Sequence, residues 1–239
     1  MNRTPWLDTL RGFAVLWMTL FHFSFDLNYF GFIRQNFYHD PFWTIQRTCI
    51  LSLFLFCAGF GQALAVKNGQ TWARFGRRWL QIAACALAVS AGSAVMFPNS
   101  WIYFGVLHGM AVMLLICRAT ASWGAWGGVG LWILGAVAIG LGNFPPITFD
   151  APAWNWIGLI SRKPITEDYV PILPWLGVMW WGMAAGLTLS FPSFQRRGGR
   201  QRLTGWLSWL GQWSLPWYML HQPVLIGLLT VYKNFISIP

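Results

Sequence analysis

Apolar runs of about 20 residues recur along this chain, and they limit its fold more than any other feature. A helix of about 20 residues is long enough to cross the hydrocarbon core of a bilayer. The pattern predicts about seven such helices, near residues 11–33, 44–66, 79–97, 101–118, 123–142, 171–190 and 213–232. Because only helices and closed barrels satisfy the backbone inside lipid, we expect an all-α polytopic membrane bundle that forms one transmembrane domain over residues 1–239.

The segments between these runs carry signals of their own. Thr4 and Pro5 have the order typical of an N-cap and a first helical residue, so the first helix is expected to begin there. The apolar piece 154–160 is too short to span and is expected in the interface. An amphipathic stretch, 203–210, precedes the last run. The first run is too long for a cleavable signal peptide, so we expect it to remain in the protein.

The composition favours a membrane protein and argues against other classes. Hydrophobic residues make up 56% of the chain and charged residues 9%, whereas an ordinary soluble domain has about 25% charged residues. The net charge of +10 comes from basic residues between the runs, which is a pattern of membrane topology rather than of nucleic-acid binding. The four cysteines lie in predicted helices without a CxxC pair, so we expect apolar packing and no metal site.

The basic residues also predict an orientation. If the predicted helices cross the membrane alternately, eleven of the 16 Lys and Arg residues fall on the side of the N-terminus. Positive residues collect on the cytoplasmic side. The N-terminus is therefore expected in the cytoplasm, and with seven helices the C-terminus is expected outside.

The first run carries ionisable residues along one face. His22 and Asp26 are four residues apart, so on a helix they lie one turn from each other. Arg11 precedes His22 by eleven residues, which is about three turns and roughly 16 Å along the same face. Asp8 falls beside this line. Ionisable groups are costly inside a membrane, so the line is a candidate functional surface.

Histidine beside a carboxylate has a definite chemical use. The carboxylate can accept a hydrogen bond from one ring nitrogen, fix the tautomer and leave the other nitrogen as a general base. Arg11 could hold an anionic group such as a phosphate. Further polar residues in the predicted helices could bind a substrate or a developing oxyanion, namely His108, His221, Tyr218, Gln222 and Arg47. The structural alternative is that these histidines only form hydrogen bonds between packed helices.

Other functions fit the same residues. Histidines at the centre of a helix bundle can be axial ligands of a b-type haem. His22, Asp26 and Arg11 could also line the path of a proton-coupled transporter, although the sequence has no clear inverted repeat. A membrane subunit without enzymatic activity is a third alternative.

Four segments resemble a known family. LDTLRGFAVLWMTLFHF places ten residues between Arg11 and His22, as in the first helix of transmembrane acyltransferases. Three further segments narrow the resemblance to a smaller group of proteins, namely FGVLHGMAV, EDYVPILPWLGVMWWGMAAG and SLPWYMLHQPV. Together the four segments resemble small bacterial membrane proteins grouped with the catalytic region of heparan-alpha-glucosaminide N-acetyltransferase. The resemblance covers most of the chain.

The resemblance implies a bacterial inner-membrane enzyme that moves an acetyl group from cytoplasmic acetyl-CoA to a hydroxyl or amine of a saccharide-like acceptor outside. It implies the lipid bilayer, acetyl-CoA and that acceptor as partners, with an oligomer left open. The catalytic pair would be His22 and Asp26. The acetyl-CoA phosphates would be held by Arg11, Arg74, Arg77, Arg78 and Arg202. The lysosomal enzyme of the family is similar but has Asn at the position of His22 and its catalytic His shortly after, so His39 remains an alternative base.

Overall fold

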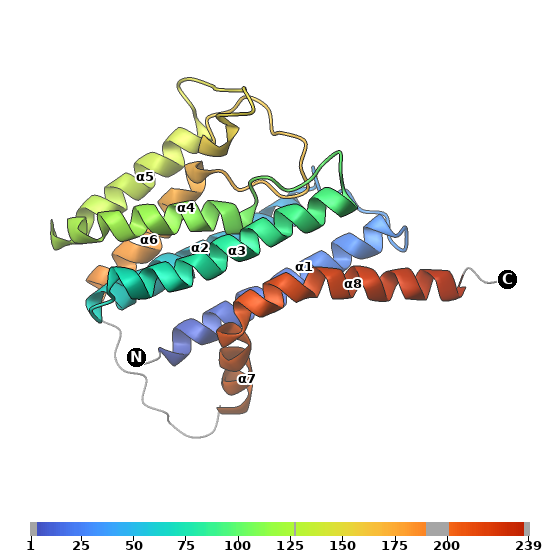
Figure 1. Ribbon diagram of the computed structural model, residues 1–239, viewed down its shortest axis with the longest axis horizontal. Helices are drawn as coiled ribbons and strands as arrows, with labels where there is room; N and C mark the ends of the chain where they lie inside the picture. The colour runs from blue at the N-terminus through green and yellow to red at the C-terminus, as the bar shows by residue number, and fades with distance from the viewer. Residues whose placement is uncertain (1–3, 127, 190–200, 237–239) are drawn as a thin grey trace. The chain divides into compact units, whose positions relative to one another are not determined.

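The computed structural model describes residues 4–126, 128–189 and 201–236, and these residues are almost entirely helical (Figure 1). No strand is present in the described ranges, where the isolated bridge between Phe104 and Tyr169 is the sheet-like contact. The predicted all-α class is therefore confirmed for this part of the chain. The α-helices are α1 (Pro5–Tyr29), α2 (Pro41–Lys67), α3 (Trp72–Met96), α4 (Val106–Ala119), α5 (Val129–Asn143), α6 (Ile172–Thr188), α7 (Gln201–Gln212) and α8 (Ser214–Ile236). Two 3-10 helices, η1 (Thr120–Trp126) and η2 (Asn155–Ile157), lie between them.

Every predicted apolar run contains a helix, but the helices differ in length. The first helix begins at Pro5 with Thr4 as its N-cap residue, as the sequence predicts. The segment 154–160 forms only the short helix η2, and the amphipathic stretch is α7. The starts differ most in the third and fifth runs. Helix α3 begins seven residues earlier than predicted. Helix α5 begins six residues later than predicted, because 120–126 forms η1 and Gly128 takes a left-handed conformation with φ of 73°.

Three of the described helical segments are both long enough and apolar enough to cross a membrane. They are Pro41–Lys67, Trp72–Met96 and Val106–Trp123. The apolar helices α5 and α6 are shorter, at 15 and 17 residues. Helices α1 and α8 have 25 and 23 residues but carry polar side chains along their length, and they are not among the three. The structure thus supports a membrane protein, whereas seven spans and their orientation stay predictions.

The chain divides into two compact units. The central unit comprises residues 55–192, and the terminal unit comprises residues 2–54 and 193–239. The boundary falls inside α2, whose first part belongs to the terminal unit and whose remainder belongs to the central unit. The prediction of one transmembrane domain over residues 1–239 stays a prediction.

The central unit is held by close helix packing. Helix α6 packs against α5 and α4, and α3 packs against α4. A Cβ atom at Gly182 of α6 would overlap the carbonyl oxygen of Phe56, and one at Gly59 of α2 would overlap that of Met179. The two helices therefore approach through small residues, as is common in membrane bundles.

Polar contacts fix the long connection between α5 and α6. Asn155 donates from Nδ2 to the hydroxyl oxygen of Tyr103 at 2.7 Å, and the Tyr169 hydroxyl donates to the Asn155 carbonyl oxygen at 2.5 Å. Burial raises the pKa of the phenols of Tyr103 and Tyr169. The Asp168 carboxylate accepts the backbone N–H of Val106 at 2.7 Å, which satisfies a free donor at the start of α4.

In the terminal unit, α1 packs against α7 and α8. A Cβ atom at Gly12 would overlap the carbonyl oxygen of Leu207, and one at Gly211 would overlap that of Asp8, so the backbones of α1 and α7 touch. Figure 1 shows α8 beside α1, and the contacts along the pair show that both run in the same direction. Trp217 donates to Thr19 Oγ1 at 2.9 Å near their beginnings, and Lys233 donates to the Phe30 carbonyl oxygen at 3.3 Å near their ends.

Candidate active site in the terminal unit

A hydrogen-bonded chain joins α1 to α8 at the centre of the terminal unit. His22 Nδ1 lies 2.7 Å from Gln222 Oε1, and Gln222 Nε2 donates to Asp26 Oδ1 at 2.8 Å. Among the described residues, His22 and Asp26 share no direct hydrogen bond. The predicted pairing of histidine and carboxylate therefore exists, but it passes through an amide from α8.

The two hydrogen bonds of Gln222 determine which ring nitrogen of His22 carries the proton. An ionised carboxylate only accepts hydrogen bonds, so the Gln222 NH₂ group must face Asp26 and its carbonyl oxygen must face His22. That oxygen needs a donor, so His22 carries its proton on Nδ1. In the neutral ring the lone pair is then on Nε2, which is the arrangement a general base requires.

His221 lies next to His22 and has the same tautomer. The two ring centroids are 5.0 Å apart, with the planes nearly perpendicular at 84°. His221 Nδ1 lies 2.8 Å from the Tyr218 carbonyl oxygen and 3.2 Å from that of Trp217. Carbonyl oxygens only accept, so His221 also has its proton on Nδ1. The ring contact leaves no room for a porphyrin between the two imidazoles, so they do not suit one haem as its two axial ligands.

Two buried atoms of this cluster have no hydrogen-bond partner among the described residues. They are Asp26 Oδ2 and His221 Nε2, and the residues that carry them are 2% and 8% exposed. A buried acceptor without a partner costs about 1–3 kcal/mol. Both atoms are acceptors, so a ligand that fits them must donate hydrogen bonds, as a hydroxyl or an amine does.

Arg11 lies on α1 with Asp8 beside it. Its Nη1 is 3.1 Å from Asp8 Oδ1, and both side chains are largely buried where α1 meets α7. The carboxylate one turn before Arg11 therefore holds the guanidinium in place.

The other predicted phosphate-binding arginines are distributed differently. Arg74, Arg77 and Arg78 are exposed at the beginning of α3 in the central unit, where Arg74 donates to the Gly69 carbonyl oxygen at 3.4 Å. Arg202 is in the first turn of α7, and its side chain lies outside the described part of the structure. The structure thus groups three of the five arginines on one helix and leaves their joint role as a prediction.

His108 belongs to the central unit, where both of its ring nitrogens have partners. Nδ1 accepts the backbone N–H of Gly105 at 3.3 Å, so the proton is on Nε2, which lies 2.9 Å from Ser90 Oγ. Ser90 in turn donates to the Ile102 carbonyl oxygen at 2.7 Å. His108 therefore donates to Ser90 and does not act as its base, and the contacts hold the first turn of α4.

The remaining predicted residues lie on the terminal unit. The Tyr218 ring lies tilted against the His221 ring with centroids 5.8 Å apart, and Arg47 is exposed on α2. His39 is exposed in the turn before α2, where its backbone N–H donates to Asn36 Oδ1 at 3.1 Å. The position of His39 in an exposed turn distinguishes it from His22, which has a polar partner inside the helix pair.

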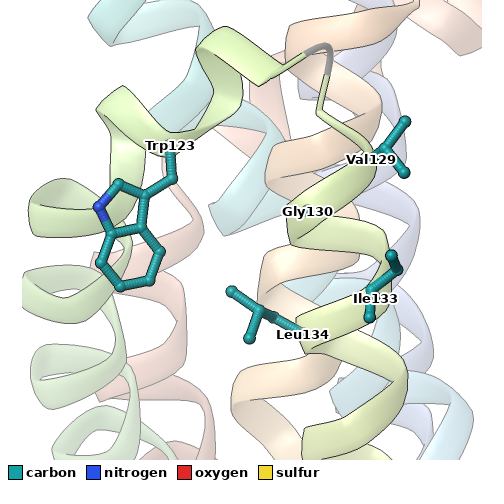
Figure 2. A pocket seen from close by; sticks show the side chains of 5 residues that line it. All are labelled: Trp123, Val129, Gly130, Ile133 and Leu134. Carbon is teal, nitrogen blue, oxygen red and sulfur yellow. The ribbon is translucent and has the colours of Figure 1, made fainter.

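Two hollows of the surface lie away from the His22 cluster. Figure 2 shows one of about 460 Å³ between η1 and α5, lined by Trp123, Val129, Gly130, Ile133 and Leu134. Its lining is almost wholly apolar and has no ionisable side chain. A smaller hollow of about 190 Å³ lies on α2 beside Thr44, Ile45, Thr48 and Cys49. Neither includes a residue of the His22 cluster.

These features define a helical membrane protein with histidine and carboxylate groups inside a helix pair. The family described as heparan-alpha-glucosaminide N-acetyltransferase, catalytic, matches residues 3–223, and the chain belongs to this family. The predicted resemblance is confirmed, and membership implies transferase activity in general. No match is found among curated proteins or among solved structures. The matched range ends one residue after Gln222 and includes every predicted site residue.

Proposed function

We propose that this protein is a membrane acetyltransferase of the bacterial inner membrane. It takes the acetyl group of cytoplasmic acetyl-CoA and passes it to a hydroxyl or amine of a saccharide at the outer side. The observation that carries the proposal is the hydrogen-bonded chain from His22 through Gln222 to Asp26. These two hydrogen bonds leave one nitrogen of the His22 imidazole able to accept a proton.

In the proposed reaction His22 is the general base. Its Nε2 takes the proton of the acceptor hydroxyl or amine while the oxygen or nitrogen attacks the thioester carbonyl carbon. The tetrahedral intermediate then collapses, the carbon–sulfur bond breaks, and the CoA thiolate takes the proton back from His22. The ionised Asp26, acting through Gln222, stabilises the imidazolium that forms between these steps.

The two unpartnered acceptors suit the other reactant. A hydroxyl or amine that donates to His221 Nε2 or Asp26 Oδ2 would satisfy an atom that is otherwise buried without a partner. Such contacts would hold the nucleophile beside His22. The chemical character of the cluster therefore favours an acceptor rich in donors, as a sugar is.

The acetyl-CoA phosphates would be held by arginines on the cytoplasmic side. Arg11 is the proposed contact on α1, with Arg74, Arg77, Arg78 and Arg202 as further contacts. Guanidinium groups bind phosphate oxygens in pairs of hydrogen bonds. Arg11 is positioned by Asp8, so a phosphate would join an existing ion pair.

The test is acetyl-CoA turnover by detergent-purified protein, with glucosamine as the acceptor probe and release of the CoA thiol as the signal. His22→Ala should lose activity by about 100-fold or more, since general-base catalysis contributes typically 10²–10⁴-fold. His39→Ala, which changes an exposed histidine, should retain activity. Wild-type turnover in His22→Ala would show that the assigned base is wrong. A loss of activity confined to His39→Ala would assign the role of general base to His39.

Two further measurements separate this function from its rivals. A Soret band in the purified protein would favour a haem protein. Ion or proton flux in proteoliposomes without acyl transfer would favour a transporter.

A further inference from the structure

We propose that Gln222 is a positioning residue that fixes the tautomer of His22 and connects it to the charge of Asp26. Its kinetic consequence rests on the proposed function, whereas the tautomer itself can be measured without any activity. The assignment differs from the sequence-based prediction, in which Gln222 binds the substrate or an oxyanion.

The chemistry of the gap between the two groups explains why an amide lies there. The group that joins an imidazole N–H to a carboxylate must accept on one side and donate on the other. A primary amide does both from one end of a side chain, because it has a carbonyl oxygen and an NH₂ group. The distances of 2.7 Å and 2.8 Å match two ordinary hydrogen bonds. A carboxylate at this position would only accept, and an aliphatic side chain would do neither.

The consequence for His22 follows from its other contacts. Within the described part of the chain, the His22 ring has its polar contact with Gln222, and the neighbouring His221 ring contacts it at the edge. Without the amide, nothing among these contacts holds the proton on Nδ1. A ring that carries its proton on Nε2 cannot accept another one there, so it cannot act as the base.

A purely structural role predicts something different. Polar side chains often join membrane helices by hydrogen bonds, and each such pair contributes only a little to the stability of the helix pair. If Gln222 only joined α8 to α1, its loss would weaken the helix pair and leave the His22 tautomer unchanged. The ring proton therefore distinguishes positioning from packing.

The experiment uses nitrogen-15 NMR of protein labelled at histidine, in nanodiscs. The chain has four histidines, so each ring can be assigned by replacing them one at a time. In the wild type, His22 should show a protonated Nδ1 and a bare Nε2. Gln222→Leu should abolish that pattern and give a mixture rich in the Nε2–H form. Gln222→Glu should keep the Nδ1–H form, because a carboxylate oxygen can also accept from it.

A matched control is available in the same unit. Gln46 on α2 accepts from Trp17 Nε1 at 3.0 Å, and its Nε2 has no hydrogen-bond partner among the described residues, so no hydrogen bond joins it to His22. Gln46→Leu therefore removes one membrane amide and should leave the His22 signals at their wild-type positions. An unchanged Nδ1–H pattern in Gln222→Leu would overturn the inference.

Kinetics provide the second measurement. With glucosamine as acceptor probe, Gln222→Leu should lower kcat by about 10- to 100-fold, the usual loss when a positioning partner is removed, and leave the KM for acetyl-CoA unchanged. An inactive wild-type protein with the expected tautomer change would refute the proposed function alone. If the wild-type protein is active and Gln222→Leu changes neither its kcat nor the His22 tautomer, this inference alone is refuted.

Discussion

If Asp26 influences His22 only through Gln222, the effects of replacing the two residues must not add. Asp26→Asn keeps the shape of the side chain and still offers an oxygen to Gln222 Nε2, but the hydrogen bond at 2.8 Å loses its charge. Hydrogen bonds to charged groups contribute about 1.5–3 kcal/mol and neutral ones about 0.5–1.5 kcal/mol. The substitution should therefore cost about 1–1.5 kcal/mol, which corresponds to a kcat lowered about 5- to 10-fold.

The double variant distinguishes a relay from two independent effects. Once Gln222→Leu has removed the amide, Asp26→Asn has no path to His22, so the kcat of the double variant should match that of Gln222→Leu within about twofold. The assay is CoA release at saturating glucosamine and acetyl-CoA. Any contact of Asp26 Oδ2 with the acceptor then appears in KM. Losses in kcat that multiply in full across the cycle would refute the relay.

Three further predictions concern other parts of the chain. Gly12→Ala should destabilise the protein by about 1–3 kcal/mol, because its Cβ would overlap the backbone of α7. Gly76 has open space around it, so Gly76→Ala should not destabilise the protein. Thermal unfolding in detergent measures both variants. Because burial raises the pKa of Tyr169, the folded protein keeps a proton that the unfolded chain releases above about pH 10. Stability should therefore fall as the pH rises past that value, and Tyr169→Phe should make the decline shallower in denaturation experiments. Arg11→Ala should abolish micromolar acetyl-CoA binding in calorimetry, with Arg34→Ala as the control, and equal binding by both variants would remove Arg11 from the donor site.

The helices could be predicted from the sequence because their signal is local. Burying an apolar run in lipid or in other helices is favourable wherever the run occurs, so each run contains a helix, although the starts of α3, α4 and α5 differ from the predicted ones by five to seven residues. The start of α1 at Pro5 was also predictable, since proline lacks the N–H that a first turn leaves unpaired. The beginning of α5 was not, because glycines around 124–130 give no periodic pattern and Gly128 takes a backbone conformation that ends one segment and begins another.

The candidate site was predictable only in part. The spacing of His22 and Asp26 on one helix put both groups on one face, and the structure keeps them there. The amide between them comes from a residue 200 positions later, and its place depends on the register of α8 against α1. The tripeptide His221-Gln222-Pro223 was a signal that polar groups occur there, but the direction of each side chain follows from tertiary packing. His108 shows the opposite case, since its spacing from Gly105 gives it a local role that the pattern of histidines did not predict.

The parallel arrangement of α1 and α8 leads to a test of the membrane topology. Two spans that run in the same direction must be separated by an odd number of crossings. The sequence predicts five such crossings between them, in the runs that contain α2 to α6, whereas α7, with 12 residues and a length of about 18 Å, is not predicted to cross. Cysteines introduced at Arg34 and Asn234, after the ends of α1 and near the end of α8, should therefore react with an impermeant maleimide from the same side, which the basic residues predict to be outside. A cysteine at Lys67 should react only from the cytoplasm. In a background without the four native cysteines, opposite labelling of positions 34 and 234 in intact cells would refute the seven-span arrangement.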